Sequence, residues 1–114
     1  MSSKSTRPDV PRNLKAYFLC LLKKGPRWNE TEGHEGLMPQ YLTYLRGEIE
    51  ARRMVFAGPV TDEGEIIAMA VLDAPSAEEA IARVSENPGI RSGHFVPELH
   101  PCFLPSLDSV RVEY

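Results

Sequence analysis

The sequence has few of the features that usually identify the functional class of a protein. Its 114 residues include two cysteines and one tryptophan, and its formal net charge is only −3. Cys20 and Cys102 both lie in apolar runs, which favours buried free thiols of a cytoplasmic protein over a disulfide. The balanced charge does not indicate a nucleic-acid surface, and no segment is typical of a signal peptide or a membrane span. We therefore expect neither nucleic acid nor membrane as a partner.

Two kinds of ligand site are also absent from the pattern. The only candidate for a phosphate loop, GPRWN at residues 25–29, lacks the glycine spacing that cradles a phosphate. His34 has no second His or Cys at the spacing of metal ligands. The sequence thus predicts no bound cofactor and no metal site.

The length allows one domain with a single modest core. Residues 1–13 are polar and carry two prolines, which predicts a flexible arm; its basic charge could touch an anionic partner. We expect the folded domain over 14–104. Residues 105–114 form a tail that could add a short strand.

Hydrophobic periodicity and turn signals predict six main elements. In order, they are a strand at 15–24, a helix at 37–52, strands at 54–60 and 65–74, a helix from Ser76 to the Asn87-Pro88-Gly89 stop, and a strand at 94–104. The first helix should bury Met38, Leu42, Leu45 and Ile49, and the second Ala77, Ala80, Ile81 and Val84. Ser76 begins a capping box with Glu79.

The order β-α-β-β-α-β predicts an α+β, ferredoxin-like fold, with 15–24 and 65–74 as central strands. Pro97 and Pro101 place the last strand at a sheet edge, because proline cannot donate to a ladder. Two helices cover one face of such a sheet, yet both central strands are apolar on both faces. A second copy packed sheet against sheet would bury the other face, so we expect a homodimer.

This topology predicts that many polar residues converge at one end of the sheet. They are Lys23, Lys24, Arg27, His34, Tyr41, Asp62, Asn87, Arg91 and His94. Each also has an ordinary structural explanation: loop solvation for the arginines and His34, core packing for Tyr41, helix termination for Asn87, and the start of an edge strand for His94. Trp28 could cover a pocket or pack its loop. Glu98 with His100, farther along the last strand, could be an acid–base pair or an interface contact.

Four stretches resemble the YCII-related (YciI-like) family of small dimeric α+β-barrel proteins, over residues 16–103. They are LLKKGPRWN, YLTYLRGEIEARRMVFAGP, SAEEAIARVSENPGIRSG and ELHP. The resemblance implies a pocket near a His on the first helix and an Asp before the proline that ends the second, the proposed catalytic pair of the family. It also implies small ring compounds as substrates of some members. Here the two positions fall on Tyr41 and Asn87.

These two departures change the expected chemistry. Tyrosine titrates near pH 10 and asparagine cannot exchange a proton as a carboxylate does, so the pair suits holding an oxygen better than moving a proton. His34 or His94 would then serve as the base, with Arg27, Trp28 and Arg91 contacting the substrate. We expect a cofactor-free lyase, isomerase or cyclase acting on a small oxygenated ring compound. The alternatives are a non-catalytic binding module and an accessory dimer that docks on another enzyme.

Overall fold

A computed structural model describes residues 14–31 and 35–114. The predicted arm and His34 lie outside these ranges. The elements are β1 (Leu14–Lys24), α1 (Leu37–Glu50), β2 (Met54–Pro59), β3 (Ile66–Leu72), α2 (Ala77–Val84), α3 (Pro88–Arg91) and β4 (Phe95–Pro105). The predicted α+β, ferredoxin-like arrangement is confirmed, and the short helix α3 is the one element that the sequence did not indicate. None of the helices within the described ranges has the length and hydropathy needed to cross a membrane.

The sheet has the strand order β2-β3-β1-β4, with every neighbouring pair antiparallel. β1 pairs with β4 without a break, from Leu14 opposite Pro105 to Lys24 opposite Phe95. Three prolines, at 97, 101 and 105, share one alternation of β4, so their missing N–H groups can all face the free edge. The prolines therefore leave the pairing intact and deprive the edge of donors that another strand would need.

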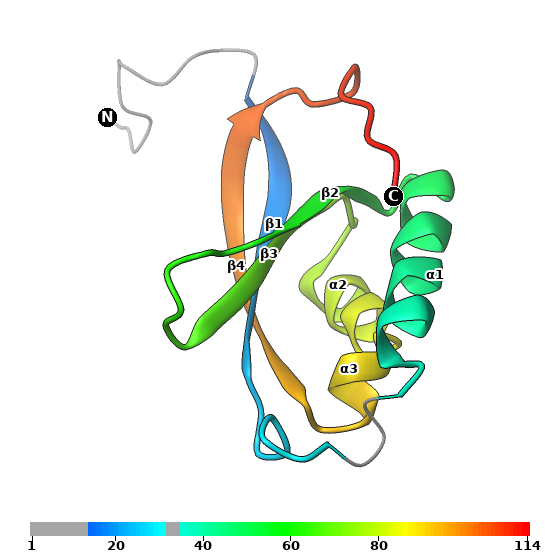
Figure 1. The fold of residues 1–114 in the computed structure, drawn as a ribbon. Helices are drawn as coiled ribbons and strands as arrows, with labels where there is room; N and C mark the ends of the chain where they lie inside the picture. Colours follow the sequence, from blue (N-terminus) through cyan, green and yellow to red (C-terminus); the bar gives the residue numbers. More distant parts are fainter. Residues whose placement is uncertain (1–13, 32–34) are drawn as a thin grey trace, which may run out of the picture.

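All three helices cover the same face of the sheet (Figure 1). The core between the layers consists of Cys20, Leu22, Leu45, Met54, Ala57, Ala70, Leu72, Ala80 and Val84. Two residues expected there are exposed instead, Met38 at 60% and Ile81 at 54%, and Ala77 is exposed as well. The eight-residue α2 buries one i, i+4 pair, Ala80 and Val84, and Ile81 lies on its exposed side.

The face of the sheet away from the helices keeps apolar side chains within reach of solvent. Met69 is 40% exposed and Val96 37% exposed on this face, and Leu21 lies beside Met69, between it and Glu98 in the strand register. Tyr17 is buried at the other end of the same face, where its hydroxyl accepts the Leu107 N–H at 2.8 Å. The apolar side chains on this face of the sheet are thus only partly buried within one chain.

The tail differs from the strand that its sequence allowed. Residues 106–114 form no strand; after β4 the chain crosses to α1 and ends beside it (Figure 1). Asp108 lies 3.1 Å from the Lys15 ammonium, and Tyr114 reaches the backbone of Ala57 in β2. Side-chain contacts to the body, rather than a backbone ladder, set the path of this segment.

The junction between α2 and β4 is tightly built. Pro88 begins α3, and the Asn87 side chain accepts the Gly89 N–H at 2.9 Å as its cap. Gly89 is buried, and a Cβ at this position would lie 2.2 Å from the ring of Phe95. Glycine is therefore required here by the close approach of β4.

A pair of Gly→Ala substitutions tests this packing. We expect Gly89→Ala to lower the free energy of unfolding by about 1–3 kcal/mol, because the added methyl group must displace Phe95. Gly47→Ala is the control: it lies within α1 with nothing within 4 Å of the added Cβ, so it should raise stability by about 0.8–1 kcal/mol. Urea denaturation of both variants measures the difference. Equal stabilities would contradict the proposed close packing.

Candidate functional site

The structure joins the ends of β1 and β4 as the topology predicts. The Gly25 N–H donates to the His94 carbonyl at 2.8 Å, and the Arg27 N–H donates to Gly93 at 2.9 Å. These bonds continue the ladder into the loop that carries Trp28. They bring the loop, the start of β4 and the first turns of α1 to one end of the sheet (Figure 1).

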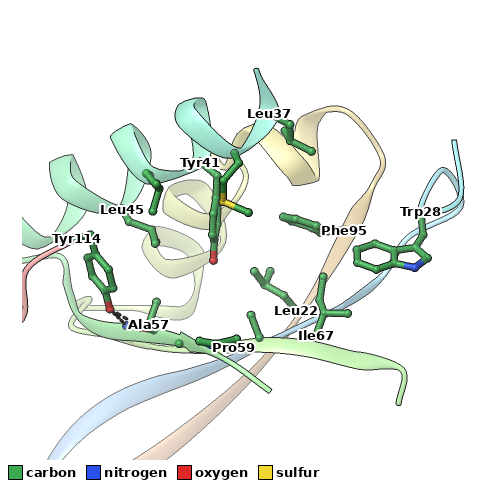
Figure 2. A pocket seen from close by; sticks show the side chains of 14 residues that line it. Leu22, Trp28, Leu37, Tyr41, Leu45, Ala57, Pro59, Ile67, Phe95 and Tyr114 are labelled. Atoms are coloured by element: carbon green, nitrogen blue, oxygen red, sulfur yellow. Dashed lines mark hydrogen bonds between the residues drawn. The ribbon is translucent and has the colours of Figure 1, made fainter. Parts of the chain in front are cut away.

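A cavity of about 480 Å³ lies between α1 and the sheet at this end (Figure 2). Its walls come from α1, all four strands, the Trp28 loop and the tail. The lining residues are Leu22, Trp28, Leu37, Met38, Tyr41, Leu42, Leu45, Ala57, Gly58, Pro59, Ile67, Ala68, Phe95 and Tyr114. An apolar cavity of this size with few polar groups is typical of a small-molecule site.

Tyr41 is the central polar group of this cavity. Its side chain extends from α1 toward the sheet (Figure 2), with its ring edge-on to Phe95 at a centroid distance of 5.8 Å. Burial raises the pKa of Tyr41 to about 12, so its hydroxyl is a neutral donor at physiological pH. No hydrogen bond joins this hydroxyl to another described residue, which leaves it available to a ligand.

Aromatic rings form one end of the cavity and a phenol forms the other. Trp28 lies against Phe95, with centroids 6.2 Å apart, and the Lys24 ammonium lies over the Trp28 ring at 5.7 Å. At the opposite end, the Tyr114 hydroxyl accepts the Ala57 N–H at 2.6 Å and donates to the Ala57 carbonyl (Figure 2). Aromatic rings thus lie at both ends of the cavity, and its hydroxyl groups belong to Tyr41 and Tyr114.

Asn87 and His94 do not line the cavity. Asn87 is 4% exposed and caps α3, while His94 is 1% exposed. The His94 ring lies between the Ser92 hydroxyl, 2.6 Å from Nδ1, and the Glu30 carbonyl, 3.3 Å from Nε2. Both side chains hold the α3–β4 junction in place.

The two arginines predicted at the rim also bond elsewhere. Arg27 donates to the Glu30 carboxylate at 2.8 Å and to the Ser92 carbonyl at 3.1 Å. Arg91 is exposed, and its guanidinium lies 3.7 Å from Glu86. The structure therefore brings Tyr41 and Trp28 of the predicted set into the cavity and places Asn87, His94 and these arginines outside it.

Glu98 and His100 lie on the sheet face away from the helices. Their side chains are 2.6 Å apart, and the Lys23 ammonium is 3.3 Å from the same carboxyl group. Hydrogen bonds from His100 and then Lys23 lower the pKa of Glu98. Over the described part of the chain, no three His, Cys, Asp or Glu side chains gather as a metal site would require.

Comparison with known proteins identifies the family. A family model described as the YCII-related domain matches residues 16–98. The chain belongs to the YCII-related family.

One solved structure with the same fold is 5-chloro-2-hydroxyhydroquinone dehydrochlorinase from Burkholderia phenoliruptrix AC1100, in complex with 2,5-dihydroxybenzoquinone. It is 20% identical, with a TM-score of 0.57, over 74% of this chain and 90% of that one. The comparison with curated proteins finds no match.

The YCII-related sequence could have indicated more of the cavity than was predicted. Phe95 is the first residue of β4 and lies on the helix-covered face, opposite Lys24 in the register, so strand alternation could have placed it. Tyr114 had no comparable signal. Its position depends on the path of a tail without periodicity, which local sequence does not specify.

The role of Asn87 can be tested by stability. We expect Asn87→Ala to lower the free energy of unfolding by about 1–2 kcal/mol, because α3 loses its cap at a buried position. Asn87→Asp keeps an oxygen acceptor there and should lose much less. Thermal and urea unfolding measure both variants. An unchanged stability in Asn87→Ala would contradict this structural role.

Proposed function

We propose that the cavity binds a small oxygenated ring compound, and that the protein acts on it as a cofactor-independent enzyme of the lyase, isomerase or cyclase type. The observation that carries this proposal is the neutral Tyr41 hydroxyl inside an apolar cavity of about 480 Å³. The cavity volume suits a substituted six-membered ring. The hydroxyquinone ligand named for the structurally similar dehydrochlorinase supports the same class.

Tyr41 would polarise a carbonyl or phenolic oxygen. A neutral O–H donor in a dry site stabilises developing negative charge on oxygen more strongly than it would in water. Phe95 and Trp28 offer faces and edges for the ring itself. Recognition would thus combine one directional hydrogen bond with burial of a flat apolar surface.

Proton transfer would need a base in addition to Tyr41. His34 and His94 are the proposed candidates for this base; His94 lies outside the cavity lining, as do Asn87, Arg27 and Arg91. The contacts of His94 with Ser92 and Glu30 make its primary contribution structural. His34→Ala is therefore the more informative substitution, with loss of turnover and retained ligand affinity as the expected result.

A specific observation also favours a second candidate, a non-catalytic binding module. Among the described lining residues, none carries a carboxylate or an imidazole. A cavity that kept its shape and its phenol but lost a neighbouring base would bind ligands without converting them. Incubation of the best ligand with the protein, followed by mass spectrometry for product, separates the two functions.

The Tyr41 hydroxyl should account for a measurable part of the affinity. Titration with hydroxylated and keto ring compounds, followed by amide NMR shifts, should perturb the cavity residues. We expect Tyr41→Phe to weaken the best ligand about fivefold to tenfold, the loss of one hydrogen bond at an apolar site. The affinity of the unsubstituted protein should be flat over roughly pH 6 to 9, because the pKa of Tyr41 is raised to about 12.

Tyr44→Phe is the matched control for this measurement. Tyr44 lies on the same helix, but its hydroxyl donates to the Arg83 carbonyl at 2.9 Å and does not line the cavity. This variant should bind ligand as the unsubstituted protein does. Equal losses in both variants would point to a general effect on the helix and sink the assignment to Tyr41.

We also propose that two copies pair through the sheet face away from the helices. The partly exposed Met69 and Val96, with Leu21 beside Met69, support this arrangement, as does the dimeric assembly that the family resemblance implies. A face of this kind is buried most simply by its own copy across a twofold axis.

Light scattering tests the pairing. Leu21→Glu places a second carboxylate opposite Glu98 on the proposed interface and should shift the molecular mass toward the 12.8 kDa monomer. Ile81→Glu, an exposed position on the helix side, should leave the mass unchanged. A monomeric mass for the unsubstituted protein at all concentrations would end the proposal.

A further inference from the structure

The phenol of Tyr114 is bound in the cavity in the way that a separate ligand would be. Its ring forms one wall, and its hydroxyl both accepts from the Ala57 N–H and donates to the Ala57 carbonyl (Figure 2). β2 is an edge strand, and these two backbone groups face away from its neighbour β3. A side chain of the tail thus supplies the hydrogen bonds that the sheet does not.

The paired backbone groups of Ala57 are selective for a hydroxyl. A hydroxyl can accept and donate at once, whereas a carbonyl or ether oxygen can only accept and an ammonium can only donate. Ala57 is 8% exposed, so a ligand atom at this point would bond to it away from bulk water. The arrangement therefore fits a group that both donates and accepts, such as the hydroxyl of a ring compound.

The tail is held lightly enough to leave this position. Val110 and Arg111 bond back to Leu107 and Asp108 within the tail. The hydrogen bonds from residues 109–114 to the described residues before 106 all involve Tyr114: two to Ala57, and one that its carbonyl accepts from Arg46 Nε at 2.6 Å. A second cavity of about 230 Å³ lies beneath Val110 and Val112, against Ile49 and Met54. A segment with few bonds and incomplete packing opens at low cost.

We propose that the Ala57 N–H and carbonyl form a subsite for a ring hydroxyl of the ligand, and that Tyr114 is an internal occupant which the ligand displaces. The inference rests on the proposed function, since it assigns one subsite of the same cavity. It adds that the ligand is a hydroxylated ring, bonded to Ala57 at one end and to Tyr41 farther along. Binding would release the tail from α1 and β2.

The two possible roles of Tyr114 predict opposite changes in ligand affinity when the tail is loosened. If Tyr114 is a fixed wall, loosening it removes contacts and weakens the ligand. If Tyr114 is a displaceable occupant, loosening it removes a competitor and strengthens the ligand. Arg46→Ala loosens the tail without altering the cavity lining, because Arg46 is exposed and contacts only the Tyr114 carbonyl at this site.

The test uses p-cresol, which reproduces the tyrosine side chain, and hydroquinone as a two-hydroxyl ring. Amide NMR titrations of the full chain give dissociation constants and report on Ala57 and Tyr114. We expect p-cresol to bind Tyr114→Ala at least about fivefold more tightly than the unsubstituted protein, with the Ala57 amide shifted. Toluene has the same ring without the hydroxyl. Its affinity for Tyr114→Ala should be at least about fivefold lower than that of p-cresol.

Hydroquinone tests displacement in the intact protein. Saturation of the protein with hydroquinone should shift the amide NMR signal of Tyr114, because the tail is released. The Arg46→Ala substitution should raise the affinity for hydroquinone about twofold to fivefold. A lower affinity in Arg46→Ala would overturn the proposal in favour of a fixed wall, even if Tyr114→Ala were too unstable to measure.

The remaining outcomes separate this inference from the function on which it rests. Ligands that perturb Tyr41 and Phe95 but leave Ala57 and the tail unchanged in every variant would overturn the subsite and keep the proposed function. A complete absence of binding by p-cresol and hydroquinone, in all variants, would overturn both.

Discussion

The uninterrupted pairing of β1 with β4 is the constraint on which the rest of this structure depends. It fixes the last strand at the sheet edge and delivers Phe95 opposite Lys24, where β1 ends. The ladder continues through Gly25 and Arg27, so the next turn places Trp28 against Phe95. One wall of the cavity therefore follows from strand register. The opposite wall follows from α1, whose position on the same face places Tyr41 above the sheet (Figure 2).

The polar residues that converge near this end serve the backbone more than the cavity. The chain turns sharply from α3 into β4, and its buried polar groups must find partners. Asn87 caps the short helix, and Arg27 and Ser92 bond within the junction around His94. A cluster of Asn, Arg and His at the end of a sheet is thus explained by the satisfaction of hydrogen bonds. The side chains that face the cavity are mainly apolar, with the two phenols of Tyr41 and Tyr114.

The sequence was sufficient for the six main elements, the sheet order and the family, because each rests on a repeated pattern or on several motifs together. It also pointed to Tyr41, on a helical stripe beside the core, and Trp28, in a loop tied to the sheet, and both line the cavity; their roles stay predictions. It could not decide where Asn87 and His94 point, since that depends on α3, a helix of four residues too short for periodicity to reveal. The tail posed the same problem. A polar segment without alternation takes its path from individual contacts, here those of Asp108 and Tyr114.

Two neutral phenols in an apolar cavity limit the chemistry that the site can support. A charged ligand would lose its hydration and gain no opposite charge from the lining, whereas an uncharged oxygenated ring would exchange hydrogen bonds with water for bonds to Tyr41 and Ala57. A lone donor such as Tyr41 stabilises negative charge only as it develops on the ligand oxygen. A reaction here would accordingly begin from a neutral ligand and use the ligand's own acidic hydroxyl or carbonyl as the polarised group. The cavity thus favours an uncharged ligand over a highly charged one.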